Sequence, residues 1–244
     1  MVYKFDHLVI TGRDKMEVAA QTLEAKGFHL TDLARHNLGS LNRLIMLDSA
    51  YLEILGWESQ AQSIRQEIAD RPCGLDALVF RTSDAGACYQ DLMESGFAPN
   101  PVQDLSRPVQ IDGEIKQALF KAVRFTAQPI PGLRIYFCQH LTPEYVWIAG
   151  DMEHSNGLIH LKEIRVGSSN PAQTYQVFAK LLKLQGSLTD SSHSWMNDYT
   201  IDLGNCLLRI HGEALESPNL ITQCQIENSD GSKIYTLSQE DFKW

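Results

Sequence analysis

The sequence repeats itself, and this internal repeat constrains the fold more than any single motif. Residues 5–10 form a run of aromatic, aliphatic and β-branched side chains that predicts a strand. Polar residues follow this strand, and the spacing of apolar residues over 15–26 then predicts a helix. Residues 74–80 and 85–95 repeat this order, and each predicted helix ends at a Gly-Phe pair. The chain therefore uses one supersecondary unit more than once.

Each unit continues with further predicted strands, in the order β-α-β-β-β. In the first unit the last strand is 51–57, and its counterpart in the second unit is 133–140. Residues 99–108 contain three prolines and several polar residues and predict a loop. This pattern predicts an α+β fold.

A third unit is expected after an irregular segment. It begins with a strand over 158–166, and a helix opened by Asn170-Pro171 and a hairpin over Gly204-Asn205 follow. We therefore divide the chain into paired units over 1–148 and an additional C-terminal unit over 149–244. A third sheet without a fourth unit to pair with would expose an edge and an apolar face, which favours a homodimer formed through this part.

Composition excludes some classes of partner. The 244 residues carry 21 Lys and Arg against 30 Asp and Glu, a net charge of −9, with no basic run, so we expect no nucleic-acid partner. No segment has the pattern of a secretory leader or a bilayer span, which predicts a cytoplasmic protein without membrane contact. Five scattered cysteines without CxxC spacing are typical of reduced thiols.

Two metal-capable side chains occupy matched places in the first unit. His7 lies in the first strand and Glu53 in the last, each within an otherwise apolar run. A buried ionisable group needs a partner, so the pair favours one shared site. The alternatives are a hydrogen-bonded core histidine and a salt-bridged strand glutamate.

These residues resemble a known family. Residues 5–9, 39–43, 51–56 and the stretch from His140 to Gly157 are similar to the glyoxalase-like branch of the vicinal oxygen chelate superfamily, and the likeness extends from residue 1 to about 210. The resemblance implies that two β-α-β-β-β units pair into an eight-stranded open cup that holds a divalent metal ion. It also implies that His7 and Glu53 are metal ligands.

The second unit departs from the family pattern. Ala77 stands where the first unit has His7, and residues 134–139 contain no glutamate. His140, at the end of that strand, is our candidate for a third ligand, because two histidines and a carboxylate suit divalent Zn, Mn or Fe, and Ni is a further candidate. Cys138 and Gln139 remain alternatives as the inward-facing group.

A polar group between two strands of the first unit is the candidate substrate site. Arg35 or Arg43 could bind a substrate carboxylate, Asn42 could orient a carbonyl, and His36 belongs to the same substrate-binding group. The alternative is a solvated hairpin. Tyr136 could line the same pocket, although strand aromatics are mostly core residues.

The sequence thus favours a metal-dependent glyoxalase-like enzyme, of the lyase, isomerase or dioxygenase type. Its substrate would be a small carbonyl or vicinal-oxygen compound, and Glu53 could also serve as the catalytic base. One alternative is a metal-free protein of the same fold that binds or sequesters a small molecule. Another is a purely structural role in which the last third of the chain serves dimerisation.

Overall fold

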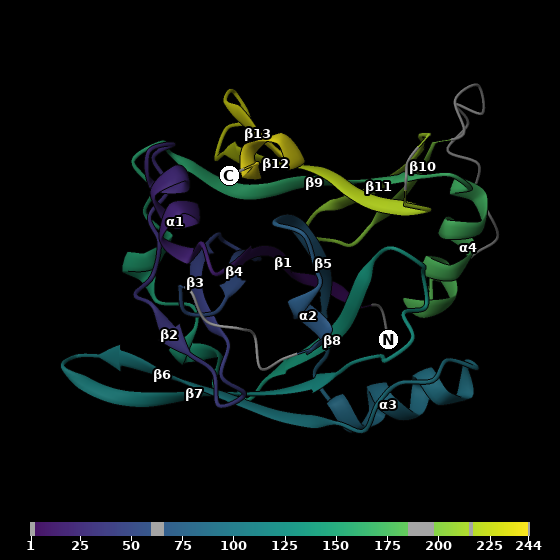
Figure 1. Cartoon of the computed structure of the whole chain (residues 1–244), viewed down its shortest axis with the longest axis horizontal. Coiled ribbons are helices and arrows are strands. Elements are labelled where there is room, and N and C mark those ends of the chain that lie inside the picture. Colours follow the sequence, from purple (N-terminus) through teal and green to yellow (C-terminus); the bar gives the residue numbers. More distant parts are fainter. Residues whose placement is uncertain (1–2, 60–65, 185–197, 215–216, 244) are drawn as a thin grey trace.

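The computed structural model describes residues 3–59, 66–184, 198–214 and 217–243 (Figure 1). The repeat predicted from the sequence is present in it. The elements of the first unit are β1 (Lys4–Arg13), α1 (Met16–Glu24), β2 (Ala34–Arg35), β3 (Leu41–Met46) and β4 (Tyr51–Gly56). The second unit consists of β5 (Gly74–Arg81), α3 (Ala85–Glu94), β6 (Gln103–Ile111), β7 (Glu114–Val123) and β8 (Arg134–His140), and it is preceded by the short α2 (Gln66–Ala69).

These two units share one eight-stranded sheet in the order β2-β3-β4-β1-β5-β8-β7-β6. β1 runs parallel to β4, β5 runs parallel to β8, and β1 and β5 meet antiparallel at the centre, so the two halves are related by a pseudo-twofold axis. The sheet curves until its ends meet, where the Asn37 amide donates to the Ser106 carbonyl at 2.9 Å. The α+β open cup expected from the sequence is confirmed.

The loop expected over residues 99–108 is wrong in its second half, because residues 103–108 belong to strand β6. Gln103–Ile111 pairs with β7 along its full length and forms a long hairpin (Figure 1). Its side chains are mostly exposed or half-buried, and it includes Pro108. Proline and polar residues are tolerated in a strand at the edge of a sheet, so the composition resembled that of a loop.

The third unit builds a second sheet from β9 (Leu158–Ser168), β10 (Tyr199–Asp202), β11 (Leu207–Gly212), β12 (Asn219–Asn228) and β13 (Ile234–Ser238), with α4 (Pro171–Leu181) beside it. The strand order is β10-β11-β9-β12-β13. β9 pairs parallel with β11 and antiparallel with β12, as β1 does with β4 and β5. The pairing around β9 therefore repeats the pairing around β1, with β12 in the position of β5, but two strands rather than three lie between α4 and β12 in the described chain.

One continuous apolar core joins the two sheets. Leu8, Ile10 and Phe80 on the outer face of the cup belong to the same buried cluster as Ile164 and Val166 of β9. In Figure 1 the third unit extends across the cup above β1 and β5. The uncovered apolar face that we expected on this unit is not present among the described residues, because the cup covers it. The homodimer stays a prediction.

The inner face of the cup has an apolar cluster of its own, formed by alternate residues of the central strands. Val9, Tyr51, Leu55 and Val79 face inward, while their neighbours in the chain face the outer core. In the described part of the chain no helix combines the length and the apolar character needed to cross a membrane.

Candidate active site in the cup

A small cavity opens on the inner face of the cup and has a volume of about 40 Å³, room for a few water molecules. Five of the residues predicted for the site line it, namely His7, His36, Asn42, Glu53 and Tyr136. His7 comes from β1, Asn42 from β3, Glu53 from β4 and Tyr136 from β8. The cavity thus collects side chains from both units.

A β-bulge in β1 determines the surroundings of His7. Phe5 and His7 pair with the consecutive residues Phe80 and Val79 of β5, so Asp6 is an extra residue in the strand. The bulge brings Asp6 beside the ring of its neighbour, and His7 Nδ1 lies 2.7 Å from Asp6 Oδ2. A buried carboxylate at Nδ1 holds the proton there and leaves Nε2 available toward the cavity.

The Nε2 side of His7 faces two other strands. It lies 3.2 Å from the hydroxyl of Tyr136 and 3.5 Å from Oε2 of Glu53, and the ring stacks on Tyr51 at 4.4 Å between centroids. Burial alone would lower the pKa of His7, but its hydrogen bonds with the carboxylates of Asp6 and Glu53 outweigh burial and raise it.

Glu53 is held as an ionised carboxylate. Asn42 Nδ2 donates to its Oε1 at 2.9 Å, and His36 Nε2 lies 3.9 Å from the same oxygen. Burial would raise the pKa of Glu53, but His7, His36 and Asn42 together bring it far below its usual range. Oε1 of Glu53 is therefore held by Asn42, and Oε2 faces His7 in the cavity.

The second unit contributes no counterpart of this pair. In the parallel ladder of β1 with β4, His7 lies opposite Tyr51 and Val9 opposite Glu53. The equivalent ladder of β5 with β8 places Ala77 opposite Arg134 and Val79 opposite Tyr136. Tyr136 therefore occupies the position of Glu53, and burial raises the pKa of its phenol, which stays neutral.

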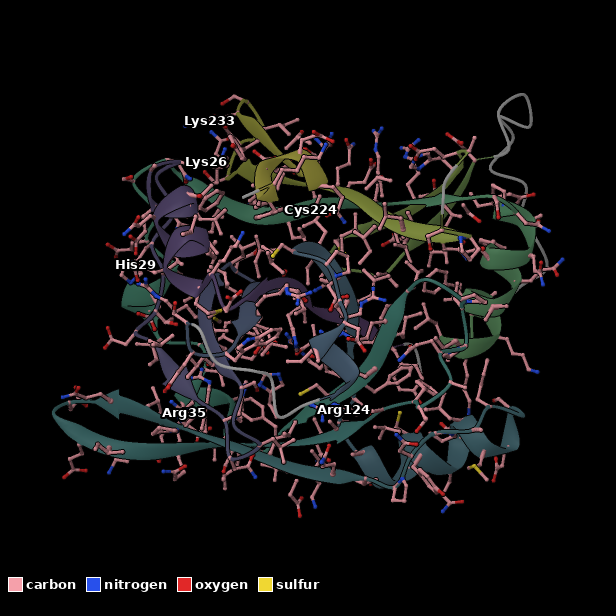
Figure 2. All side chains as sticks on the ribbon, in the orientation of Figure 1. Lys26, His29, Arg35, Arg124, Cys224 and Lys233 are labelled. Carbon is pink, nitrogen blue, oxygen red and sulfur yellow. The ribbon has the colours of Figure 1, made fainter. Side chains whose placement is uncertain are left out.

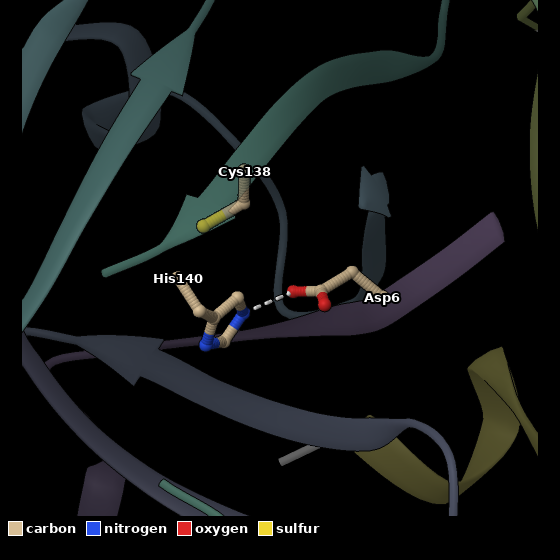
Figure 3. Close-up of side chains that lie close together, drawn as sticks. All are labelled: Asp6, Cys138 and His140. Carbon is tan, nitrogen blue, oxygen red and sulfur yellow. Dashed lines mark hydrogen bonds and ion pairs between the residues drawn. The ribbon is translucent and has the colours of Figure 1, made fainter. Parts of the chain in front are cut away.

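The structure does not bring His140 into the cavity. Its Nε2 lies 2.9 Å from Asp6 Oδ2, the interaction drawn in Figure 3, and its Nδ1 is buried with no hydrogen-bond partner among the described residues. Asp6, Cys138 and His140 have possible ligand atoms within 4.8 Å of one another. However, Asp6 already accepts from His7 and His140, and from Arg81 at 2.6 Å. This arrangement fits a hydrogen-bond network better than an ion.

The two arginines predicted to bind a substrate carboxylate point away from the cavity. Arg35 pairs with Glu58 on the surface and lies on β2 in Figure 2. Arg43 Nε donates to the Thr31 carbonyl at 2.8 Å, because alternation along β3 turns Asn42 inward and Arg43 outward. The structure therefore does not place these two arginines in the lining of the cavity.

Two other arginines line the cavity instead. Arg107 comes from β6, and Arg124 directly follows β7 and lies in the lower half of the cup in Figure 2. Sequence reasoning missed Arg107 because it assigned that segment to a loop. It also missed Asp6, although the repeat carried a signal, since Asp76 precedes Ala77 just as Asp6 precedes His7.

The cavity residues fit a divalent ion of the kind that the resemblance implies. His7 Nε2 and Glu53 Oε2, 3.5 Å apart, have the separation expected of two ligands that each lie about 2.1 Å from one ion. Asn42 Oδ1 beside them is buried and has no hydrogen-bond partner among the described residues. His36 Nε2 lies 3.9 Å from Glu53 Oε1, although His7, Glu53 and His36 do not form a group in which all three ligand atoms lie within 4.8 Å of one another. A nitrogen and oxygen donor set of this kind suits zinc, manganese or iron.

Comparison with known proteins identifies a family and agrees with the observed fold. A family model described as a glyoxalase-like domain matches residues 5–182. Among solved structures, a hypothetical protein from Staphylococcus aureus is similar with a TM-score of 0.67 at 15% identity, over 96% of this chain and 98% of that one. No curated protein matches the sequence.

Two further solved structures are similar at low identity. One is a xylose isomerase-like TIM barrel/4-hydroxyphenylpyruvate dioxygenase fusion protein, with a TM-score of 0.54 at 11% identity, over 93% of this chain and 37% of that one. The other is a mutant of 4-hydroxymandelate synthase from Streptomyces coelicolor, with a TM-score of 0.46 at 13% identity, over 97% of this chain and 63% of that one. The chain thus spans well under half of the fusion protein, and likeness at these identities concerns the fold.

Proposed function

The chain belongs to the glyoxalase-like domain family, and from this we propose that it is a metal-dependent enzyme that acts on a small carbonyl or vicinal-oxygen compound. The reaction would be of the lyase, isomerase or dioxygenase type. The observation that carries the proposal is the pairing of His7 Nε2 with Glu53 at 3.5 Å in a cavity, with Asp6 behind the histidine. A carboxylate that orients a histidine in this way is a common support of a metal ligand.

In this proposal His7 and Glu53 hold the ion, and His36 replaces His140 as the candidate for a third ligand. A divalent ion bound there supplies Lewis-acid activation of two adjacent substrate oxygens. Asp6 keeps the proton of His7 on Nδ1, and Asn42 orients Glu53 through its amide. Both contacts hold the donor atoms in place before substrate arrives.

Two groups are available for proton transfer. Glu53 is the one carboxylate among the described residues that line the cavity, and because it is ionised it can accept a proton from bound substrate. The neutral phenol of Tyr136 can donate a hydrogen bond to a substrate oxygen beside His7. We therefore propose Glu53 as both ligand and base.

The change of His7 to Ala tests the proposal. We expect His7→Ala to lose bound metal while it stays folded, because the ion is the main partner of Nε2. Metal analysis after purification without added metal measures the loss. Chelator should lower the melting temperature of the wild type and leave that of His7→Ala unchanged.

The matched control is His140→Ala. It removes a second imidazole from the same Asp6 carboxylate but leaves the cavity lining unchanged. It should keep its metal and lose about 1–3 kcal/mol of stability, because a buried acceptor loses a donor. An equal response of wild type and His7→Ala to chelator would contradict metal binding at His7.

That outcome would favour the second candidate, a metal-free protein that binds or sequesters a small molecule. The observation behind this alternative is the second unit, in which Ala77 and Tyr136 occupy the positions of His7 and Glu53. Of the four matched positions in the two units, only those of the first unit therefore carry a histidine or a glutamate.

A further inference from the structure

We propose that the ligand of the cup is a small hydroxy acid and that Arg107 is the residue that binds its carboxylate. The inference rests on the proposed function, since it concerns the same cavity, and it names the chemical class of the substrate. Three observations carry it, namely the burial of Arg107, its lack of partners among the described residues, and an acceptor left open in the lining of the same cavity.

Arg107 is buried without a partner. It lies on β6 opposite Ala118 of β7, and only 5% of it is exposed. Among the described residues it makes no hydrogen bond and no ion pair. The other buried charged side chains of the described chain all have partners. Asp6, His7, Glu53, Asp76, Arg134 and Glu163 each form at least one ion pair.

An unpaired guanidinium in such a place is costly. Burial lowers the pKa of Arg107, and this effect exceeds the opposing electrostatic influence of Tyr51, Glu53 and Asp151. Glu53 is already committed to His7 and Asn42. A buried charge such as this one, with no ion-pair partner in the described part of the chain, is stabilised when a ligand brings the opposite charge. The planar fork of arginine matches a carboxylate with two parallel hydrogen bonds.

The position of Arg107 also gives an anion access to it. The residue borders both the cavity and a larger surface pocket of about 510 Å³ formed with residues 29–34 and the segment around Asp151. A ligand that enters from this pocket would meet Arg107 before it meets His7 and Glu53.

The other residues of this small cavity limit what the anion can be attached to. Asn42 Oδ1 is buried without a donor among the described residues, so a hydroxyl group of the ligand can donate to it. Leu105 and Phe120 also line the cavity and favour a short carbon skeleton. A compact molecule that carries both a carboxylate and a hydroxyl group would interact with both Arg107 and Asn42.

Lactate and lactamide provide a matched pair of probes, because they have nearly the same shape and differ in charge. With the full-length chain we expect lactate to bind at least about tenfold more tightly than lactamide by isothermal titration. In Arg107→Gln the ratio of the affinity for lactate to the affinity for lactamide should fall to about one. Arg43→Gln removes an arginine from the same cup, outside the cavity, and should keep the wild-type ratio.

Melting temperatures without ligand separate a ligand-binding arginine from a structural one. Arg107→Gln should melt at or above the wild-type temperature, since it removes a buried charge without an ion-pair partner. Lactate should raise the melting temperature of the wild type and not that of the variant. A large drop on mutation would assign Arg107 a structural role and overturn the proposal.

Three further results would also overturn the proposal. The first is equal binding of lactate and lactamide to the wild type, and the second is an unchanged ratio of these two affinities in Arg107→Gln. The third is Arg107-dependent binding of inorganic phosphate that is tighter than the binding of lactate. The titrations are repeated on chelated protein and on His7→Ala. A lactate preference that persists there supports the anion site even if the metal proposal fails. Metal retention without a lactate preference would contradict only the anion site.

Discussion

At the residue scale, Asp6 is the side chain on which the candidate site depends most. Its Oδ2 lies within hydrogen-bonding distance of both His7 and His140, and its Oδ1 accepts from Arg81. Burial would raise the pKa of Asp6, but the two histidines hold it well below its usual range. We expect Asp6→Asn to weaken metal binding about 10–100-fold, because the neutral amide orients His7 less firmly. Titration of the chelated protein with Zn²⁺ measures the change.

The matched control is Asp76→Asn, since Asp76 holds the equivalent bulge position in β5. This carboxylate binds Arg134 at 2.7 Å, outside the cavity. The variant should lose about 3–5 kcal/mol of stability, because a buried arginine is left unpaired, and should keep its affinity for Zn²⁺. An equal loss of affinity in both variants would show a general effect of destabilisation.

At the scale of elements, one histidine connects the segment before β9 to the first unit. His154 Nε2 donates to the Met46 carbonyl at 2.8 Å, and Nδ1 accepts from the His29 amide at 3.0 Å, so the ring must be neutral. Burial lowers the pKa of His154 below its ordinary value. A lowered histidine pKa stabilises the fold above the unfolded value of about 6.5, and this contribution is lost as the pH falls.

We therefore expect the contribution of His154 to the free energy of unfolding to be lost from pH 7 to pH 5, so that over this range the wild type loses more stability, or gains less, than His154→Gln does. Urea titrations at several pH values measure the difference. His211→Gln, a change in β11 of the third unit, should keep the wild-type dependence. Identical pH profiles for wild type and His154→Gln would contradict the prediction.

At the scale of the whole molecule, the shared core decides how the chain unfolds. Leu8 and Phe80 of the cup lie in one cluster with Ile164 of the third unit. We expect the full chain to unfold in a single cooperative step, with coincident urea transitions by circular dichroism and tryptophan fluorescence. A fragment of residues 1–148 should melt at a lower temperature and bind a hydrophobic dye, because the outer face of β1 and β5 is then uncovered. Two separate transitions would instead support two independent domains divided at residue 148.

Much of the architecture follows from local properties of the sequence. The spacing of apolar residues and the repeat of strand, helix and glycine predicted the β-α-β-β-β order, because these patterns reflect the periods of strand and helix. The same patterns placed His7 and Glu53 on strands whose side chains meet in one cavity. β6 was missed because an exposed edge strand has no apolar alternation to detect.

The sequence by itself therefore determined the repeated unit, the cup and one histidine–glutamate pair. Only the tertiary structure decided the neighbours of that pair. A bulge in β1 turned Asp6 toward His7, alternation turned Arg43 outward, and the closure of the hairpin β6–β7 brought Arg107 into the cavity. The face on which a strand residue lies depends on register and bulges, and these arise from pairing between segments far apart in the chain.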